Sequence, residues 1–261
     1  MIREITSLAN PTVKAVRALH MRKERAETGL FLAEGLKIVT EAVELGHPPK
    51  TLLYVPEEPK HPLLQKAIEA TSANGGEVVE VTPAILGKIA RRDNPQAVLG
   101  VFEQRLTPLS ALVPTSAPCW VGLEMVRDPG NLGTIIRTAD AAGCGAVILI
   151  GECCDPWSVE AVRASMGSIF ATPVVKASVP EFLAWRETWP GSVVGTLLSA
   201  GTDYRKADYH KPVLILMGNE QQGLTSEMAA ACDVAVKIPM RGRADSLNLA
   251  VATGVMIYAA S

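Results

Sequence analysis

The sequence of 261 residues has neither a long apolar run nor an excess of charge of one sign. No apolar stretch approaches the roughly 18 residues of a membrane-spanning helix. The opening MIREITSLANPTVKAVRAL also lacks the apolar core of a signal peptide. A formal net charge of -2 excludes a protein that coats polyanions with its whole surface, although it allows a local basic patch. We therefore expect a soluble, cytoplasmic protein that does not associate with a membrane.

Metal-binding and disulfide patterns are missing as well. The five cysteines are odd in number and no two form a CxxC pair, so neither a zinc site nor a disulfide framework is expected. Adjacent Cys153 and Cys154 leave a redox pair open as an alternative to free thiols, which are the favoured interpretation. The cysteines are Cys119, Cys144, Cys153, Cys154 and Cys232.

A stretch with three prolines and little periodicity, QRLTPLSALVPTSAP, indicates a linker between two domains. We place the linker at residues 104–117, the N-terminal domain at 1–103 and the C-terminal domain at 118–261. Strand-like runs in the N-terminal domain alternate with helical patterns, which predicts a small α/β domain. The strands are expected at 30–34, 51–56, 77–82 and 97–102, and the helices at 35–46, 61–76 and 83–93.

The C-terminal domain has longer apolar runs and a final segment, SLNLAVATGVMIYAAS, that is apolar almost all round. Continuous apolar strands are typical of a mostly parallel sheet that is covered on both faces. A helix without a polar face is expected to be buried in a core or an interface. The strands are predicted at 119–125, 146–151, 192–198 and 212–218.

Cations gather near the start of the N-terminal domain, where Asn10 and Pro11 fit the N-cap and first position of a helix. Their positive field is suited to the phosphates of RNA, but a solvated helix face is the alternative that the sequence leaves open. Phe31 and Tyr54 lie inside apolar strands and are expected in the core. The cations are Lys14, Arg17, Arg22, Lys23 and Arg25.

A first motif, DPGNLGTIIRTADAAG, spans residues 128–143 between a predicted strand and a helix. It has neither the Lys-Ser/Thr of a P-loop nor the three-glycine spacing of a dinucleotide fingerprint. Its glycines allow a close approach of the backbone, and the start of a helix favours an anion. Arg137, one turn after Gly133, is suited to a phosphate, although a surface salt bridge would also explain it.

A second motif, LILMGNEQQGLT, covers residues 214–225, and a third, IPMRGRADSLNLAVATGVMIYA, covers 238–259. Each places a glycine-bearing loop directly after a strand, which is where parallel sheets bind ligands. Glu220 follows the first of these strands, and a helix capped around Thr225 comes next. Ser246 is the expected N-cap of the last helix. Asn248, predicted inside that buried helix, needs a polar partner.

Together the three motifs resemble those of the SpoU (TrmH-like) branch of the SPOUT RNA methyltransferases, in the same order and at fitting separations. The start of the chain, ITSLANPTVKAVRAL followed by GLFLAEGLKIV, is similar to the substrate-binding domain that these enzymes often carry. The resemblance implies an α/β fold with a C-terminal trefoil knot, S-adenosylmethionine as the cofactor, no metal, and a homodimer with active sites at the subunit interface.

The resemblance also implies roles for individual residues. The expected cofactor-binding residues are Leu197, Leu198, Gly218, Asn219, Gly223, Ile238, Met240 and Leu247. The expected catalytic residues are Asn131, Arg137, Glu220, Ser246 and Asn248. In the segment VEAVRASMGSIFATPV, Arg163 and Ser165 are expected to contact RNA together with the N-terminal cations. A guanidinium stays protonated far above neutral pH, so Arg137 is better suited to hold a phosphate or a developing alkoxide than to act as a base.

The leading hypothesis is an RNA methyltransferase that modifies a ribose 2′-hydroxyl, with ribosomal RNA as the favoured substrate and transfer RNA as the alternative. A Rossmann-type oxidoreductase is the hypothesis from a different class. The absence of GxGxxG and of an acidic residue at the end of a second strand argues against it. An RNA-binding protein without catalysis is the third, and the intact motifs argue against that.

Overall fold

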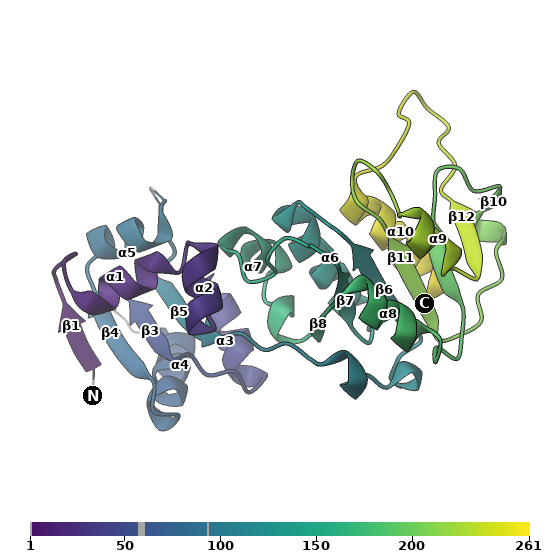
Figure 1. The fold of residues 1–261 in the computed structure, drawn as a ribbon. Coiled ribbons are helices and arrows are strands. Elements are labelled where there is room, and N and C mark those ends of the chain that lie inside the picture. Colours follow the sequence, from purple (N-terminus) through teal and green to yellow (C-terminus); the bar gives the residue numbers. More distant parts are fainter. Residues whose placement is uncertain (1, 57–60, 93) are drawn as a thin grey trace. The chain divides into compact units, whose positions relative to one another are not determined.

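The computed structural model describes residues 2–56, 61–92 and 94–261. The chain forms two compact units (Figure 1). The first contains residues 1–104 together with 155–170, and the second contains 105–154 together with 171–261. The segment 155–170 lies within the predicted C-terminal domain by sequence, yet it packs in the first unit.

A five-stranded mixed sheet forms the centre of the first unit, in the order β1-β4-β3-β5-β2. β5 pairs antiparallel with β2 and β3, whereas β4 pairs parallel with β1 and β3. The strands are β1 (Ile2–Ile5), β2 (Leu30–Glu34), β3 (Thr51–Tyr54), β4 (Glu77–Val81) and β5 (Val98–Glu103). The helices are α1 (Pro11–Ala18), α2 (Arg22–Thr28), α3 (Leu36–Glu44), α4 (Pro62–Ala73), α5 (Pro83–Ala90) and α7 (Val159–Ser165).

Alternating side chains give this sheet two buried faces. Leu53, Val79 and Val101 join one core with apolar residues of α1 and α5. Phe31 and Phe102 point to the opposite face, which α3 and α4 cover. Phe31 and Tyr54 are each 1% exposed, which confirms that they belong to the core.

The segment 155–170 packs along β2, the edge strand of this sheet. Trp157 and Phe170 stack against Phe31, with ring centroids 4.7 and 5.7 Å away, and Phe170 lies 4.8 Å from Phe102. Val159 packs on the core of the other face. The segment therefore covers an edge that would otherwise be open to pairing with another strand.

The second unit contains a seven-stranded sheet in the order β10-β12-β9-β11-β6-β7-β8, and every pairing in it is parallel. This confirms the mostly parallel sheet predicted from the apolar runs. The strands are β6 (Cys119–Glu124), β7 (Val147–Ile150), β8 (Val174–Ala177), β9 (Val193–Thr196), β10 (Thr202–Asp203), β11 (Val213–Met217) and β12 (Val234–Lys237).

Helices cover both faces of this sheet (Figure 1). On one face α6 and α10 pack against each other, and α10 also contacts β11 and β6. On the other face, residues of α8 and α9 join a core with Trp120, Leu214 and Leu216. The helices are α6 (Pro129–Ala141), α8 (Val179–Arg186), α9 (Ser226–Ala230) and α10 (Leu249–Ala260). Because β6, β9, β11 and β12 run parallel, the loops that follow them all emerge at the same edge of the sheet.

Several predicted boundaries differ from the structure. The cations from Lys14 to Arg25 were predicted to lie on one helix, and this is wrong: α1 ends at Ala18 and a second helix, α2, begins at Arg22. The short strand β1 pairs with β4 and was not predicted, since its four residues show little apolar alternation. Helix α5 ends at Ala90, where the helical pattern suggested 93; Asp93 itself lies outside the described residues.

Candidate active site

A cavity of about 790 Å³ opens at the carboxyl ends of β9, β11 and β12. Its size lies within the range of small-molecule and cofactor sites. All eight residues predicted to bind a cofactor line it, as do four of the five predicted catalytic residues. These are Leu197, Leu198, Gly218, Asn219, Gly223, Ile238, Met240 and Leu247 from the first group, and Asn131, Glu220, Ser246 and Asn248 from the second.

The loop after β11 is closed on itself so tightly that Gly218 has no room for a side chain. Asn219 and Gly223 form an antiparallel bridge, with their backbone N–H and C=O groups 2.9 and 3.0 Å apart. A Cβ at position 218 would lie 2.0 Å from the carbonyl carbon of Gly223. Gly223 itself has a φ of 71°, which glycine adopts without strain. This cradle of bare backbone lines the cavity and fits a ligand held largely by backbone groups.

A network of hydrogen bonds joins three residues from the three motifs. The Glu220 carboxylate accepts from the backbone N–H groups of Arg127 and Asp128, both at 3.2 Å, and from Asn131 Nδ2 at 3.4 Å. Asn248 Nδ2 in turn donates to Asn131 Oδ1 at 2.9 Å. The orientation of the Asn131 amide is therefore fixed from both ends.

Asn248 has a second role that the sequence analysis assigned to Ser246. Asn248, not Ser246, is the N-cap of α10, and its Oδ1 accepts from the N–H groups of Ala250 and Val251. Its position inside the helix was therefore predicted wrongly, and the polar partner that it needs is the side chain of Asn131. Ser246 is exposed and donates to Asp245 Oδ1 at 3.2 Å.

Arg137 lies on α6, exposed and six residues after Asn131. It does not line the cavity, and the network around Glu220 does not include it. Asp128 is the N-cap of α6: its carboxylate accepts from the N–H of Asn131 at 2.6 Å, and its own N–H donates to Glu220. The start of this helix is thus tied to the loop that carries Glu220.

Two features of the site were not singled out from the sequence. Glu124, the last residue of β6, is 1% exposed and accepts from the Thr225 N–H at 2.8 Å and its hydroxyl at 2.7 Å. Met125 adopts a left-handed φ of 49°, and its carbonyl accepts from Asn219 Nδ2 at 2.8 Å. A strained non-glycine residue is often found at a functional site. A charged residue ending an otherwise apolar strand was the available signal for Glu124.

Two of the residues predicted to contact RNA are buried within the first unit. Arg25 is 4% exposed: its Nε and one terminal nitrogen bind Asp155 Oδ2 at 2.8 and 2.7 Å, and the other terminal nitrogen donates to the Leu19 carbonyl. Ser165 is fully buried and donates to the Val162 carbonyl. Neither side chain reaches solvent, so their predicted contact with RNA is wrong.

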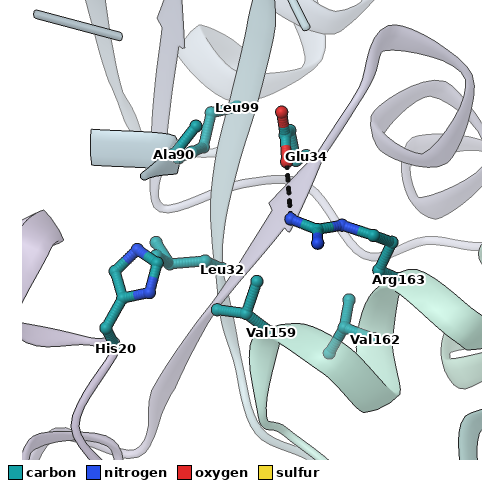
Figure 2. A pocket seen from close by; sticks show the side chains of 8 residues that line it. All are labelled: His20, Leu32, Glu34, Ala90, Leu99, Val159, Val162 and Arg163. Carbon is teal, nitrogen blue, oxygen red and sulfur yellow. Dashed lines mark hydrogen bonds and ion pairs between the residues drawn. The ribbon is translucent and has the colours of Figure 1, made fainter. Parts of the chain in front are cut away.

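Arg163 has a partner within the first unit as well. Figure 2 shows it extending from α7 to Glu34 of β2, with a distance of 3.1 Å between the guanidinium and the carboxylate. Arg163 and Glu34 line a small cavity of about 10 Å³ beside His20, Leu32 and other residues. The ion pair ties α7 to the edge strand.

The described residues contain no group of three or more His, Cys, Asp or Glu placed to hold a metal ion. All five cysteines are free thiols, as the sequence analysis favoured. Burial raises the pKa of the Cys154 thiol to about 12, and the neighbouring Cys153, Glu220 and Asp128 act in the same direction. At neutral pH this thiol is therefore protonated.

None of the helices described is long and apolar enough to cross a membrane.

A parallel α/β unit with a cavity at its strand ends, bordered by an amide and carboxylate network, is typical of domains that bind a cofactor or another small ligand. Residues 118–258 match the SpoU rRNA Methylase family, and residues 10–100 match the MRM3-like substrate binding domain. The chain belongs to the SpoU rRNA methylase family.

Known relatives cover almost the whole chain. The chain is 30% identical to the 23S rRNA (guanosine(2553)-2'-O)-methyltransferase RlmP of Bacillus subtilis, over 98% of both sequences. It is 33% identical to the 23S rRNA (uridine(2479)-2'-O)-methyltransferase of Streptomyces viridochromogenes, over 92% of this chain and 85% of that one. The crystal structure of an AdoMet-bound rRNA methyltransferase from Sinorhizobium meliloti superimposes with a TM-score of 0.93 at 50% identity, covering 99% and 97% of the two chains.

Membership of this family makes the protein an RNA methyltransferase that uses S-adenosylmethionine (AdoMet). The backbone cradle at Gly218 fits that cofactor. Membership of this family excludes the alternative hypothesis of a Rossmann-type oxidoreductase.

Proposed function

We propose that this protein methylates a ribose 2′-hydroxyl of ribosomal RNA. One observation carries the proposal: the cavity that contains all eight expected cofactor residues borders the network of Asn131, Glu220 and Asn248. The relatives named above are 2'-O-methyltransferases of 23S rRNA, and the chain covers nearly their full length.

The chemistry asks little of the protein beyond alignment and removal of one proton. When bound, S-adenosylmethionine supplies an electrophilic methyl group, and its sulfonium becomes a neutral thioether after transfer. The ribose oxygen forms the new bond to carbon and loses its proton to solvent or to a nearby acceptor. Asn131, fixed between Glu220 and Asn248, is placed to orient the nucleotide beside the cavity.

Arg137 and Ser246 have roles outside that network in this proposal. Arg137 supplies a guanidinium that stabilises a phosphate or the developing alkoxide. Because Arg137 lies on the exposed surface of α6, we assign it to an active site completed by a second copy of the chain. Ser246, on the exposed loop before α10, contacts the nucleotide.

The homodimer is supported by the exposed apolar residues of α10. Val251 is 54% exposed and Tyr258 is 64% exposed, on a helix that packs beside the α6 of Arg137. Residues seven apart lie on the same helix face. An apolar face of this kind next to a functional arginine fits a subunit interface better than solvent.

The trefoil knot is part of the same proposal. The chain leaves β11 through the Gly218 loop, forms α9 and β12 beyond β9, and then returns through residues 238–248 to α10. α10 packs against β11, β6 and α6, back near the middle of the sheet. This return path is the one a threaded C-terminal segment requires. We also propose a division of the sequence into domains at 1–103 and 118–261 with a linker at 104–117, in which residues 155–170 of the second domain pack in the first unit, and a cytoplasmic location.

The decisive experiment incubates the protein with methyl-labelled S-adenosylmethionine and either ribosomal or transfer RNA, followed by alkaline hydrolysis. A 2′-O-methyl group blocks cleavage of the adjacent phosphodiester, so we expect the label in alkali-resistant dinucleotides from ribosomal RNA. Label in mononucleotides would mean methylation of a base and refute the ribose proposal. Label only in transfer RNA would show that transfer RNA, and not ribosomal RNA, is the substrate.

The network is tested by Glu220→Gln, which keeps the shape of the side chain and removes its charge. We expect a loss of 10- to 100-fold in kcat, because a displaced Asn131 misaligns the nucleotide, with little change in affinity for S-adenosylmethionine. Glu227→Gln, an exposed carboxylate on α9, is the matched control. Equal activity of the two variants would contradict the role of the network.

A further inference from the structure

The first unit contains a second large hollow, far along the sequence from the methyltransferase motifs. It has a volume of about 910 Å³ and is open to solvent along α5. Its lining includes the cations Arg17, Lys88, Arg91 and Arg92 and the amides Asn94 and Gln96. We name it the basic groove. The described residues that line it include no carboxylate.

We propose that the basic groove binds the phosphate backbone of the RNA substrate. This inference rests on the proposed function for the identity of the RNA. The groove adds a contact surface with named residues, on elements that do not contain the methyltransferase motifs.

Helix α5 organises the groove. Pro83, Gly87 and Arg91 are spaced four residues apart and so follow one face of the helix. They line the groove from the first turn of α5 to its C-cap. Eight residues at about 1.5 Å each make this helix about 12 Å long. That length is more than two helical turns, so the residues that line the groove extend along it.

The loop after α5 holds its cations in place. Arg91 has a left-handed φ of 56°, and its N–H and that of Arg92 both donate to the Gly87 carbonyl. Arg92 also lies 3.8 Å from Glu34, a carboxylate that is itself held by Arg163. The carboxyl end of a helix carries a partial negative charge that repels anions. Lys88, Arg91 and Arg92 lie at this end and reverse that charge. The left-handed backbone at Arg91 is unfavourable for a residue with a side chain, and it places this arginine at the end of the helix.

The composition of the groove favours a backbone over a base or a small anion. No aromatic side chain is among its described lining residues, so bases have no stacking platform. The groove is open to solvent, and its cations come from α1, from α5 and from the loop after α5, which suits a chain of phosphates better than a single enclosed anion. Phosphate contacts position a nucleic acid and give salt-dependent affinity without reading sequence.

The structure also separates cations that the sequence grouped together. Arg17 lines the groove, whereas Lys14 and Lys23 are exposed elsewhere on α1 and α2, and Lys23 pairs with Glu27 at 3.7 Å. Lys37 and Lys66 have no predicted role in RNA binding and are exposed on the same unit, where they pair with Glu41 at 3.8 Å and Glu44 at 2.7 Å. They therefore provide a control of equal charge.

The test compares Lys88→Gln/Arg91→Gln with Lys37→Gln/Lys66→Gln in the full-length protein. Binding of a fluorescently labelled single-stranded RNA of mixed sequence is measured by anisotropy over a range of salt concentrations, without cofactor. We expect the groove variant to lose roughly tenfold in affinity, with the salt slope reduced by about 0.7 for each phosphate that the protein no longer neutralises. The control variant is expected to bind as the wild type does.

Equal losses in both variants would show a general effect of charge and overturn the proposal, as would no loss in the groove variant. Titration with S-adenosylmethionine is expected to give wild-type affinity for both, which shows that the cofactor site is intact, and an unchanged urea midpoint is expected to show that the first unit is folded. If the wild type binds RNA through the groove yet transfers no methyl group to it, the proposed function fails and the groove stands. If methylation proceeds with an unchanged KM for RNA in the groove variant, the groove fails and the function stands.

Discussion

At position 218 a single added carbon atom is expected to disturb the loop that lines the cofactor cavity. Because a Cβ there would meet the backbone of Gly223 and Leu224, Gly218→Ala must open the loop. We expect at least a tenfold loss in affinity for S-adenosylmethionine, measured by calorimetric titration, at a cost of roughly 1–3 kcal/mol in strain. Gly242→Ala, in the loop before α10 and with nothing within 4 Å of a new Cβ, is the control. Unchanged affinity in Gly218→Ala would remove the backbone cradle from the binding site.

His20 makes the stability of the first unit depend on pH. Burial lowers its pKa below 6.5 and nearby arginines add to this effect, although a hydrogen bond to the Ile89 carbonyl opposes it. The folded protein therefore favours neutral His20, and the unfolded chain takes up a proton more readily. The stabilising contribution is present above pH 6.5 and is lost as pH falls through the lower pKa of the folded state.

The measurement is the urea midpoint of unfolding above and below pH 6.5 for the wild type and His20→Gln. We expect the wild type to lose more stability than the variant on acidification. Parallel decreases would attribute the pH dependence to other groups.

At the scale of elements, the buried pair of Arg25 and Asp155 fastens α7 and its flanking residues to the first unit. Arg25→Ala leaves Asp155 without its partner at 12% exposure, and we expect a loss of about 3–5 kcal/mol in the free energy of unfolding. Urea denaturation followed by fluorescence measures it, with exposed Arg22→Ala as a control within about 0.5 kcal/mol.

The double variant Arg25→Met/Asp155→Asn is expected to recover part of the loss, because no charge is left buried. An Asn at position 155 keeps the side-chain oxygen that accepts from the backbone N–H of Trp157 at 3.0 Å. A double variant less stable than Arg25→Ala would show that the pair is not the source of the effect.

The elements themselves were largely predictable from sequence, and the exceptions have physical causes. Apolar runs located β6, β7, β9 and β11 to within two residues at each end, because buried parallel strands are apolar on both faces. The motif residues were predicted to meet because loops after parallel strands emerge at one edge. The N-cap of α10 was misplaced, since Ser246 and Asn248 are both good caps and only tertiary contact with Asn131 selects between them.

Long-range packing was not predictable in the same way. Arg25 looks like any other cation in a basic stretch, and no local pattern shows that Asp155 lies 130 residues away in sequence and in contact with it. The return of 155–170 to the first unit is also a property of the folded chain. Helical periodicity shows that α7 has an apolar side, and it does not show which sheet that side covers.

For the whole molecule, the proposed homodimer makes α10 the element to disrupt. Val251→Glu/Tyr258→Glu places two charges on its exposed apolar face, and we expect the dimer to dissociate because charges are costly at the core of an interface. Sedimentation equilibrium measures the mass, with Val113→Glu, at 58% exposure outside α10, as the control. A wild type that sediments as a monomer would contradict the dimer, and a dimeric variant would place the interface elsewhere.

The division of the first unit between two stretches of sequence also affects its synthesis. Residues 1–104 leave the ribosome without the aromatic rings of Trp157 and Phe170 that cover Phe31, and the last of these is made 66 residues later. At about 5–20 residues per second, the gap amounts to roughly 3–13 seconds. During that time the β2 edge is bare on the nascent chain, so this strand is open to pairing with other strands until residues 155–170 have been made.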